Sequence, residues 1–186
     1  MLKIHVPKTE MWDEYIQEFV SCDSQDLALE HSLVSISKWE SKWHKPFLSK
    51  ENKTDEEIRD YVRFMTLTQN VDPKIYRCLS KDNLKDIMEY IDNPMTATWF
   101  NEKGYNGKVN TYRRSGEQVT SELIYYWMVS LNIPFECQKW HLNRLLTLIK
   151  ICNIKNQKPD KIGKKEILKS NAAINAARRQ KLNTKG

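Results

Sequence analysis

Histidine and cysteine are the side chains of this sequence with the clearest capacity for catalysis, because both can exchange protons near neutral pH. The four histidines are His5, His31, His44 and His141, and Cys137 precedes His141 by one helical turn. A Cys–His pair can supply a nucleophile and its base, and a histidine beside a carboxylate can act as a general acid or base. No spacing pairs the histidines with such a partner, and Cys137 lies in a tryptophan-rich segment, where burial would raise the pKa of its thiol. We therefore predict structural or surface histidines and a packed cysteine.

Motifs for phosphate and metal binding are absent from the sequence. It contains no G-x-x-x-x-G-K-[ST], no G-x-G-x-x-G and no H-E-x-x-H, and its five glycines leave little material for a phosphate-binding loop. The four cysteines are far apart in the sequence, without C-x-x-C spacing or a histidine at zinc-finger spacing: Cys22, Cys78, Cys137 and Cys152. We expect four reduced, packed thiols, no bound metal and no cofactor.

The most apolar stretch runs from residue 118 to residue 156 and has the pattern of two helices separated by one proline. Thr120 or Ser121 can cap the first helix, with Glu122 in its first turn, where a carboxylate complements the helix dipole. Apolar residues then recur at helical spacing. Pro134 prevents the residue before it from remaining helical and can start the next helix. The pattern predicts a largely buried helical hairpin.

The first part of the chain predicts one short β-hairpin followed by a helix. Residues 2–6 and 15–20 alternate apolar and polar side chains, which is typical of strands. A helical period begins at Gln25, with Ser24 or Asp23 available as its cap. We expect the two strands to pair and to pack against the helices that follow.

Three further start signals predict small helices between residue 54 and residue 93. Thr54-Asp55-Glu56-Glu57 is a capping box, and Asp72-Pro73 is a cap followed by a proline that suits a turn or two of helix. Ser80 begins another helix, which Asn93-Pro94 ends. We expect these helices to pack around two tryptophans, Trp39 and Trp43.

Residues 95–117 hold three of the five glycines and almost no aliphatic side chain. This composition predicts an exposed loop or, because of Asn106-Gly107, a hairpin, and both remain open. Aromatic side chains could stack on bases, but most of the tryptophans lie at helical spacing beside aliphatic residues, as core residues do. Three aromatic residues lie in contexts that favour exposure and are candidates for binding a partner: Trp12, Trp99 and Tyr105.

Length and composition favour one compact, mainly α domain. The 186 residues suffice for one core, and 29% charged and 40% hydrophobic residues with few glycines are typical of a soluble α-rich protein. The sequence shows no apolar run long enough for a membrane span and no signal peptide, so we expect a cytoplasmic protein. The expected architecture is a helical domain at residues 1–156, with a short N-terminal β-hairpin and a central helical hairpin, and a basic linker and C-terminal helix at residues 157–186.

The basic character of the chain is a property of its C-terminal tail. Residues 157–186 contain nine lysines and arginines against two acidic residues, a net charge of +7, which leaves −1 for residues 1–156. Such a tail can bind phosphates in a salt-dependent manner, or stay solvated until a protein partner orders it. We favour the protein partner, because the helix mixes alanine and isoleucine with its basic residues, and we expect no membrane contact, because its apolar face has no aromatic residue. The candidate contact residues are Lys164, Lys165, Lys169, Arg178, Arg179 and Lys181.

Three parts of the sequence resemble small proteins of tailed bacteriophages and prophages. They are LEHSLVSISKWESKWHKPFL, MTATWF, and the stretch from SELIYYWMVSLNIPFECQKW to LTLIKICNIKN followed by AAINAARRQKLNTKG. The resemblance covers nearly the whole chain and is to proteins of the tail-morphogenesis region, among them tail assembly chaperones. Those helper proteins hold the tape measure protein before the tail tube polymerises around it. The resemblance implies no catalytic residue.

The resemblance and the composition together predict a non-enzymatic assembly factor in the host cytoplasm. Its helical body would bind the tape measure protein or another tail protein, the basic tail would add contacts, and a homo-oligomer is compatible with this function. Two alternatives remain open. The chain could be a structural component of the virion, such as a head-to-tail connector or neck protein, or it could bind nucleic acid through its tail.

Overall fold

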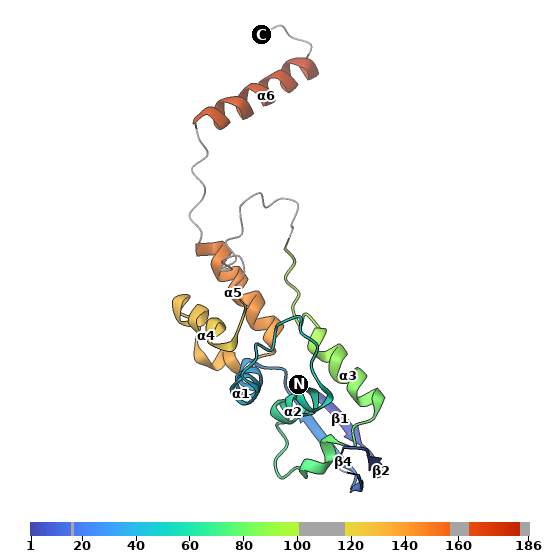
Figure 1. The fold of residues 1–186 in the computed structure, drawn as a ribbon. Coiled ribbons are helices and arrows are strands. Elements are labelled where there is room, and N and C mark those ends of the chain that lie inside the picture. Colours follow the sequence, from blue (N-terminus) through green and yellow to red (C-terminus); the bar gives the residue numbers. More distant parts are fainter. Residues whose placement is uncertain (16, 101–117, 157–163, 183–186) are drawn as a thin grey trace. The chain divides into compact units, whose positions relative to one another are not determined.

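The computed structural model describes residues 1–15, 17–100, 118–156 and 164–182, with the backbone alone for Met11, Asp13 and residues 164–167. The chain divides into two compact units, Met1–Asn153 and Ile154–Gly186. In these ranges helices predominate, but four strands make the fold mixed α and β, where the sequence predicted a mainly α fold (Figure 1). Within the described ranges, no helix combines the length and the apolar character needed to cross a membrane.

The four strands form two nested antiparallel pairs at the start of the first unit. Strand β1 (Leu2–Val6) pairs with β4 (Gln25–Leu29), and β2 (Thr9–Asp13) pairs with β3 (Glu18–Cys22). The predicted pairing of residues 2–6 with residues 15–20 is therefore wrong. Side chains of β1 and β4 that face the helices are buried, namely Ile4, Val6, Leu27 and Leu29.

The helix predicted from Gln25 begins eight residues later than expected, because residues 25–29 form β4. Helix α1 (Leu33–Trp43) starts after Ser32, whose hydroxyl accepts the N–H of Ser35 in a capping box. Leu29 and Leu33 lie four residues apart, so their helical spacing crosses a strand–helix junction. Pairing with β1 decides the outcome, because every residue of β4 has a register partner in β1.

The three predicted starts between residue 54 and residue 93 are confirmed. Helix α2 (Asp55–Met65) has a capping box in which Thr54 and Glu57 satisfy each other's backbone N–H groups. The 3-10 helix η1 (Pro73–Tyr76) follows the cap Asp72, and α3 (Lys81–Asp92) follows Ser80. Residues 93–100 have no regular structure, and the remainder of the predicted loop or hairpin, with Tyr105, lies outside the described residues.

The apolar stretch forms the two helices predicted around Pro134, with a third element between them. Helix α4 (Ser121–Ser130) has Thr120 as its N-cap, and α5 (Leu142–Asn156) follows the 3-10 helix η3 (Phe135–Lys139). The second helix starts later than Pro134 because residues 141 and 142 bond to the β4–α1 junction. The Leu142 N–H donates to the His31 carbonyl at 2.8 Å, and Ser32 and His141 form an isolated bridge. Helix α4 packs against α1.

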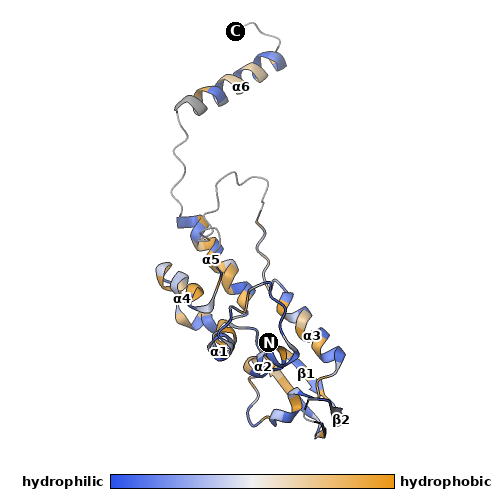
Figure 2. Cartoon of the chain, viewed as in Figure 1, coloured by the Kyte–Doolittle hydropathy of each residue, from blue (hydrophilic) through white to orange (hydrophobic). Residues whose placement is uncertain are grey.

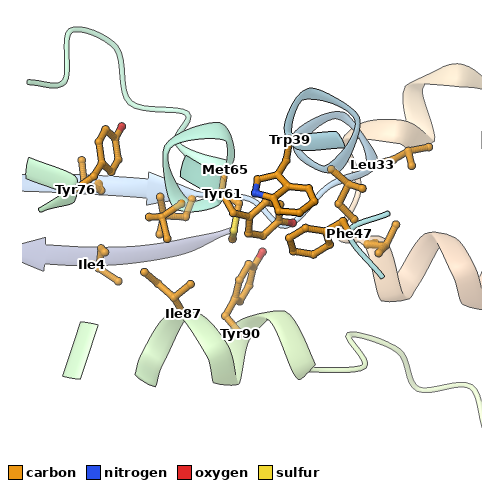
Figure 3. Packing of buried hydrophobic residues seen from close by; sticks show 14 of the residues in the cluster. Ile4, Leu33, Trp39, Phe47, Tyr61, Met65, Tyr76, Ile87 and Tyr90 are labelled. Carbon is orange, nitrogen blue, oxygen red and sulfur yellow. The ribbon is translucent and has the colours of Figure 1, made fainter. Parts of the chain in front are cut away.

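An aromatic cluster fills the space between α1, α2 and α3 (Figure 3). The Phe47 ring lies 4.0 Å from the Tyr61 ring and 5.1 Å from the Trp39 ring, measured between centroids. Trp39 is buried, and its indole N–H donates to the Glu57 carbonyl at 2.8 Å. Trp39 is thus the core residue that the sequence predicted. The other three tryptophans at helical spacing are half-buried at the edge of the core: Trp43, Trp127 and Trp140.

The second unit contains helix α6 (Lys164–Leu182), the C-terminal helix that the sequence predicted. All its side chains from Leu168 to Leu182 are exposed. Its helical propensity, with four alanines and lysine-rich ends, accounts for a helix that needs no packed face.

Candidate partner-binding surface

The two-stranded pair β2–β3, which we call the aromatic ribbon, presents a tryptophan and a phenylalanine to solvent. Successive side chains of a strand point to opposite faces, and the face that carries Val20 and Cys22 is buried. Trp12 and Phe19 are directly opposite each other on the other face, with 50% and 68% of their surfaces exposed. Their rings lie 5.1 Å apart at 68°, an edge-to-face arrangement. The exposure that was predicted for Trp12 is therefore present, and Phe19, which the sequence did not single out, accompanies it.

The aromatic ribbon is acidic. Between Thr9 and Cys22 the sequence holds four acidic residues and no lysine, arginine or histidine: Glu10, Asp13, Glu14 and Glu18. The three glutamates are exposed. At the base of the ribbon, Lys8 and Asp23 form an ion pair of 2.9 Å. The exposed rings thus lie among carboxylates.

Helix α4 and the start of η3 expose a second set of large apolar side chains. Ile124 and Met128 are fully buried, but Tyr126, Val129 and Phe135 are more than half exposed. Figure 2 shows hydrophobic residues along α4. The helix is apolar around most of its circumference while it packs on one side only, so the prediction of a largely buried helix is correct for that side and wrong for the other.

The remaining candidates lie on other segments of the chain. Trp99 is 93% exposed in a segment without regular structure, next to Phe100, whose ring lies 4.0 Å from Lys150 Nζ. The tail candidates are on α6. The side chains of four of them are exposed, namely Lys169, Arg178, Arg179 and Lys181, and only the backbone is described for Lys164 and Lys165.

Two histidines that lie far apart in the sequence meet inside the first unit. His31 and His141 are buried with their ring centroids 5.0 Å apart. His31 Nδ1 lies 2.5 Å from the Tyr61 hydroxyl oxygen. His141 Nδ1 accepts the Asn143 N–H at 3.3 Å, so its Nε2 carries the proton that is donated to the Tyr90 carbonyl at 3.0 Å. No signal in the sequence pairs these two residues, because separate elements place them.

The surroundings of this histidine pair keep both rings neutral. Burial, and then the nearby His141, lower the pKa of His31 to about 3, and burial also lowers the pKa of His141. Glu30 accepts a hydrogen bond from the Tyr90 hydroxyl at 2.6 Å beside the pair. The rings lie in packed interior and make structural hydrogen bonds, so they connect α5 to the β4–α1 junction.

A third histidine takes part in an arrangement with the atom order of a Ser–His–Asp relay. Ser24 Oγ lies 3.2 Å from His5 Nε2, and His5 Nδ1 lies 2.6 Å from Asp26 Oδ1. His5 and Asp26 are register partners in β1 and β4, and 61% and 84% of their side chains are exposed. Water screens such charges strongly. We interpret the arrangement as a cross-strand pair that favours the strand register.

Three of the four cysteines are buried, and all four are free thiols. Cys22, Cys78 and Cys137 are buried, and Cys152 is half-buried. Burial raises the pKa of the Cys137 thiol, and burial and the adjacent Cys22 thiol raise the pKa of Cys78 to about 12. Cys137 and His141 have separate environments, since His141 bonds to Tyr90 and Asn143. In the described ranges, no group of three or more metal-ligating side chains is found.

Glu40 is an important buried residue whose role the sequence did not reveal. One carboxylate oxygen accepts the Phe47 N–H at 2.8 Å, and the other accepts the Ser121 N–H at 2.7 Å. Ser121 is the first residue of α4, where a negative charge complements the helix dipole. The side chain therefore joins α1, the following loop and α4. The only sign of this role in the sequence is that Glu40 shares a helix face with the apolar residues Ile36 and Trp39.

Comparison with known proteins gives no further information on this surface: no family model, no curated protein and no solved structure matches the chain. Function therefore has to be inferred from the surfaces themselves. They consist of an acidic aromatic ribbon, an apolar side of α4 with η3, and a basic helix in the second unit.

Proposed function

We propose that the chain is a non-enzymatic assembly factor, a phage tail assembly chaperone that binds the tape measure protein during tail morphogenesis. The observation that carries the proposal is the exposure of large aromatic side chains on ordered elements, above all Trp12 and Phe19 on the aromatic ribbon. Aromatic residues supply a disproportionate share of the binding energy at protein interfaces, and exposed apolar patches mark such interfaces. The sequence resemblance to tail assembly chaperones supplies the identity of the client.

The placement of three histidines supports a function in binding rather than in catalysis. General acid–base catalysis needs a group that is accessible to substrate and held in a partly dry cleft. His31 and His141 are buried in the packed interior, whereas the side chain of His5 is exposed to solvent and pairs with Asp26 of the neighbouring strand. The exposed side chains that remain available are suited to contact another protein.

A second surface supports the same proposal. Tyr126, Val129 and Phe135 extend the exposed apolar area over α4 and η3, on a helix that is fixed by its N-cap and by Glu40. A rigid apolar surface loses little conformational entropy when it binds. A client segment with apolar residues would bury it.

Co-expression with the client tests the proposal. The tape measure protein encoded in the same tail region is expressed with the tagged chain, and we expect the two to co-purify. The double variant Trp12→Ala/Phe19→Ala should lose most of the client, whereas Met88→Ala, which truncates an exposed residue of α3, should retain it. Failure of the wild-type chain to retain any client would contradict the proposal.

The exposed tail helix favours nucleic-acid binding as a second candidate function. Lys169, Arg178, Arg179 and Lys181 are all available to phosphates. Binding through them would fade as salt is added and would be abolished by their replacement with glutamine. Mass spectrometry of mature particles beside the lysate tests the remaining alternative: a virion component is present in particles in stoichiometric amount, and a chaperone is absent from them.

A further inference from the structure

The charge around the exposed rings indicates which kind of segment the aromatic ribbon binds. All four side chains between Thr9 and Cys22 that are charged at neutral pH are acidic, although residues 1–156 as a whole carry a net charge of only −1. A local concentration of one sign attracts the opposite sign and steers its approach. The occupant that complements this surface is therefore cationic.

The strand register brings one of these carboxylates to the same face as the rings. Trp12 and Glu10 lie two residues apart on β2, and their register partners are Phe19 and Ser21 on β3. These four side chains share the solvent face, because Val20 and Cys22 face the core. A lysine or arginine that lies over the face of Trp12 would be close to a carboxylate on the same side of the ribbon.

Both kinds of contact favour the same ligand group. The face of an indole ring attracts cations, and tryptophan does so best among the aromatic residues. Phe19 contacts Trp12 edge to face, so each ring fixes the orientation of the other. The rings also offer apolar surface to the aliphatic part of a lysine or arginine side chain.

We propose that the aromatic ribbon is a docking site for a cationic segment of a protein partner, in which lysine or arginine residues contact Trp12 and pair with Glu10 beside it, while Glu14 and Glu18 add to the negative charge that attracts the segment. The proposal rests on the proposed function for the existence of a client, and it adds the chemistry of the client segment. It also explains why charges of one sign surround the exposed rings.

The test uses the full-length chain and two fluorescent peptides. One alternates lysine with leucine, and the matched peptide has glutamate in place of every lysine. The lysine peptide should bind, with an affinity that falls as salt is added, and the glutamate peptide should not bind. The affinity should fall by roughly tenfold or more in Trp12→Ala/Phe19→Ala and in Glu10→Gln/Glu14→Gln/Glu18→Gln, and should be unchanged in Met88→Ala. Because these side chains are exposed, each variant should still unfold in one cooperative thermal transition within a few degrees of the wild type, which verifies that it is folded.

Two results with the peptides would overturn the proposal. The first is equal binding of the lysine peptide to the wild type and to the Trp12→Ala/Phe19→Ala variant. The second is evidence that the carboxylates of the ribbon only prevent its strand edges from pairing with another copy of the chain. In that case the three glutamate-to-glutamine changes would cause self-association and leave peptide affinity unchanged.

The basic helix α6 of the chain is the competing occupant, and a variant separates it from an external partner. Replacement of its six basic residues by glutamine should leave the affinity for the lysine peptide unchanged if the site serves a partner protein: Lys164, Lys165, Lys169, Arg178, Arg179 and Lys181. A large gain in peptide affinity, with loss of any concentration-dependent self-association, would identify α6 as the occupant and overturn the proposal.

Client binding distinguishes failure of this inference from failure of the proposed function. A tape measure protein that co-purifies equally with the wild type and with the ribbon variants would overturn the docking site and leave the chaperone function standing. Absence of client binding together with ribbon-dependent binding of the lysine peptide would support the docking site and contradict the chaperone function.

Discussion

The chain contains two tryptophan–phenylalanine pairs with nearly the same geometry and opposite surroundings. Trp39 and Phe47 lie 5.1 Å apart at 80°, and Trp12 and Phe19 lie 5.1 Å apart at 68°. The residues of the first pair are 1% and 9% exposed, whereas those of the second pair are 50% and 68% exposed. Ring geometry therefore does not decide what an aromatic pair does.

The two pairs differ in the process that removes water from their rings, which is folding for the first pair and would be binding for the second. Trp39 and Phe47 are desolvated during folding, and Glu57 and the Tyr61 ring complete their contacts. Trp12 and Phe19 gain their mutual contact on folding but keep apolar surface that only a second molecule can cover. We expect truncation of the first pair to lower stability and truncation of the second pair to lower binding.

The largest expected effect is on the buried pair. Trp39→Ala should lower the free energy of unfolding by about 3–5 kcal/mol, because it removes a large buried ring and leaves a cavity. Urea denaturation monitored by circular dichroism measures it. Trp99→Ala, at a site that is 93% exposed, is the matched control and should change stability by less than about 0.5 kcal/mol. Similar losses in the two variants would remove the basis of the comparison.

A smaller loss is expected from the carboxylate that holds the loop containing Phe47. Glu40→Ala leaves the N–H groups of Phe47 and Ser121 without their acceptor, so the free energy of unfolding should fall by roughly 2–4 kcal/mol. Denaturant unfolding of this variant beside Glu89→Ala, an exposed site on α3, measures the difference. Unchanged stability in Glu40→Ala would mean that water replaces the carboxylate without cost.

Acid should destabilise the interior through the histidine pair. The pKa of His31 is about 3 in the folded chain and about 6.5 when unfolded. Between these values the unfolded chain binds the extra proton, so the free energy of unfolding is unaffected above pH 6.5 and falls by roughly 1.4 kcal/mol per pH unit below it. Urea denaturation at a series of pH values should show a smaller slope for His31→Gln than for the wild type. Identical slopes would show that His31 gains access to protons without unfolding.

The smallest effect on stability is expected at the exposed pair. Trp12→Ala/Phe19→Ala should lower the free energy of unfolding by at most about 1 kcal/mol, since it removes one exposed aromatic contact. The same variant should lose the client in the pull-down described above. Thermal unfolding of the variant beside the wild type measures the first effect, and a loss as large as that of Trp39→Ala would place the ribbon in the core.

Local signals in the sequence were sufficient for the starts of α2, α3 and α4 and for the exposure of two tryptophans. Thr54, Ser80 and Thr120 act as caps through hydrogen bonds to residues three positions later, so neighbouring residues contain the information. Trp12 and Trp99 stand apart from the aliphatic residues that recur at helical spacing, which is why their exposure could be predicted.

Contacts between distant residues account for what the sequence did not reveal. The strand β4 has residues that also fit a helical stripe, and pairing with β1 decides between the two. His31 meets His141, and Glu40 binds the N–H of Ser121, across separations that no short pattern encodes. The apolar side of α4 was misassigned as core for a related reason, because composition cannot tell which side of an apolar helix a neighbour will cover.

The nesting of the strands has a consequence for how this chain can diversify. The outer pair brings Val6 and Gln25 opposite each other, so the ribbon is an insertion whose two ends are neighbours. Residues at its tip can change in length or character while the register of β1 and β4 stays the same. A laboratory graft that replaces the tip between Trp12 and Phe19 should therefore leave the β1–β4 pair intact.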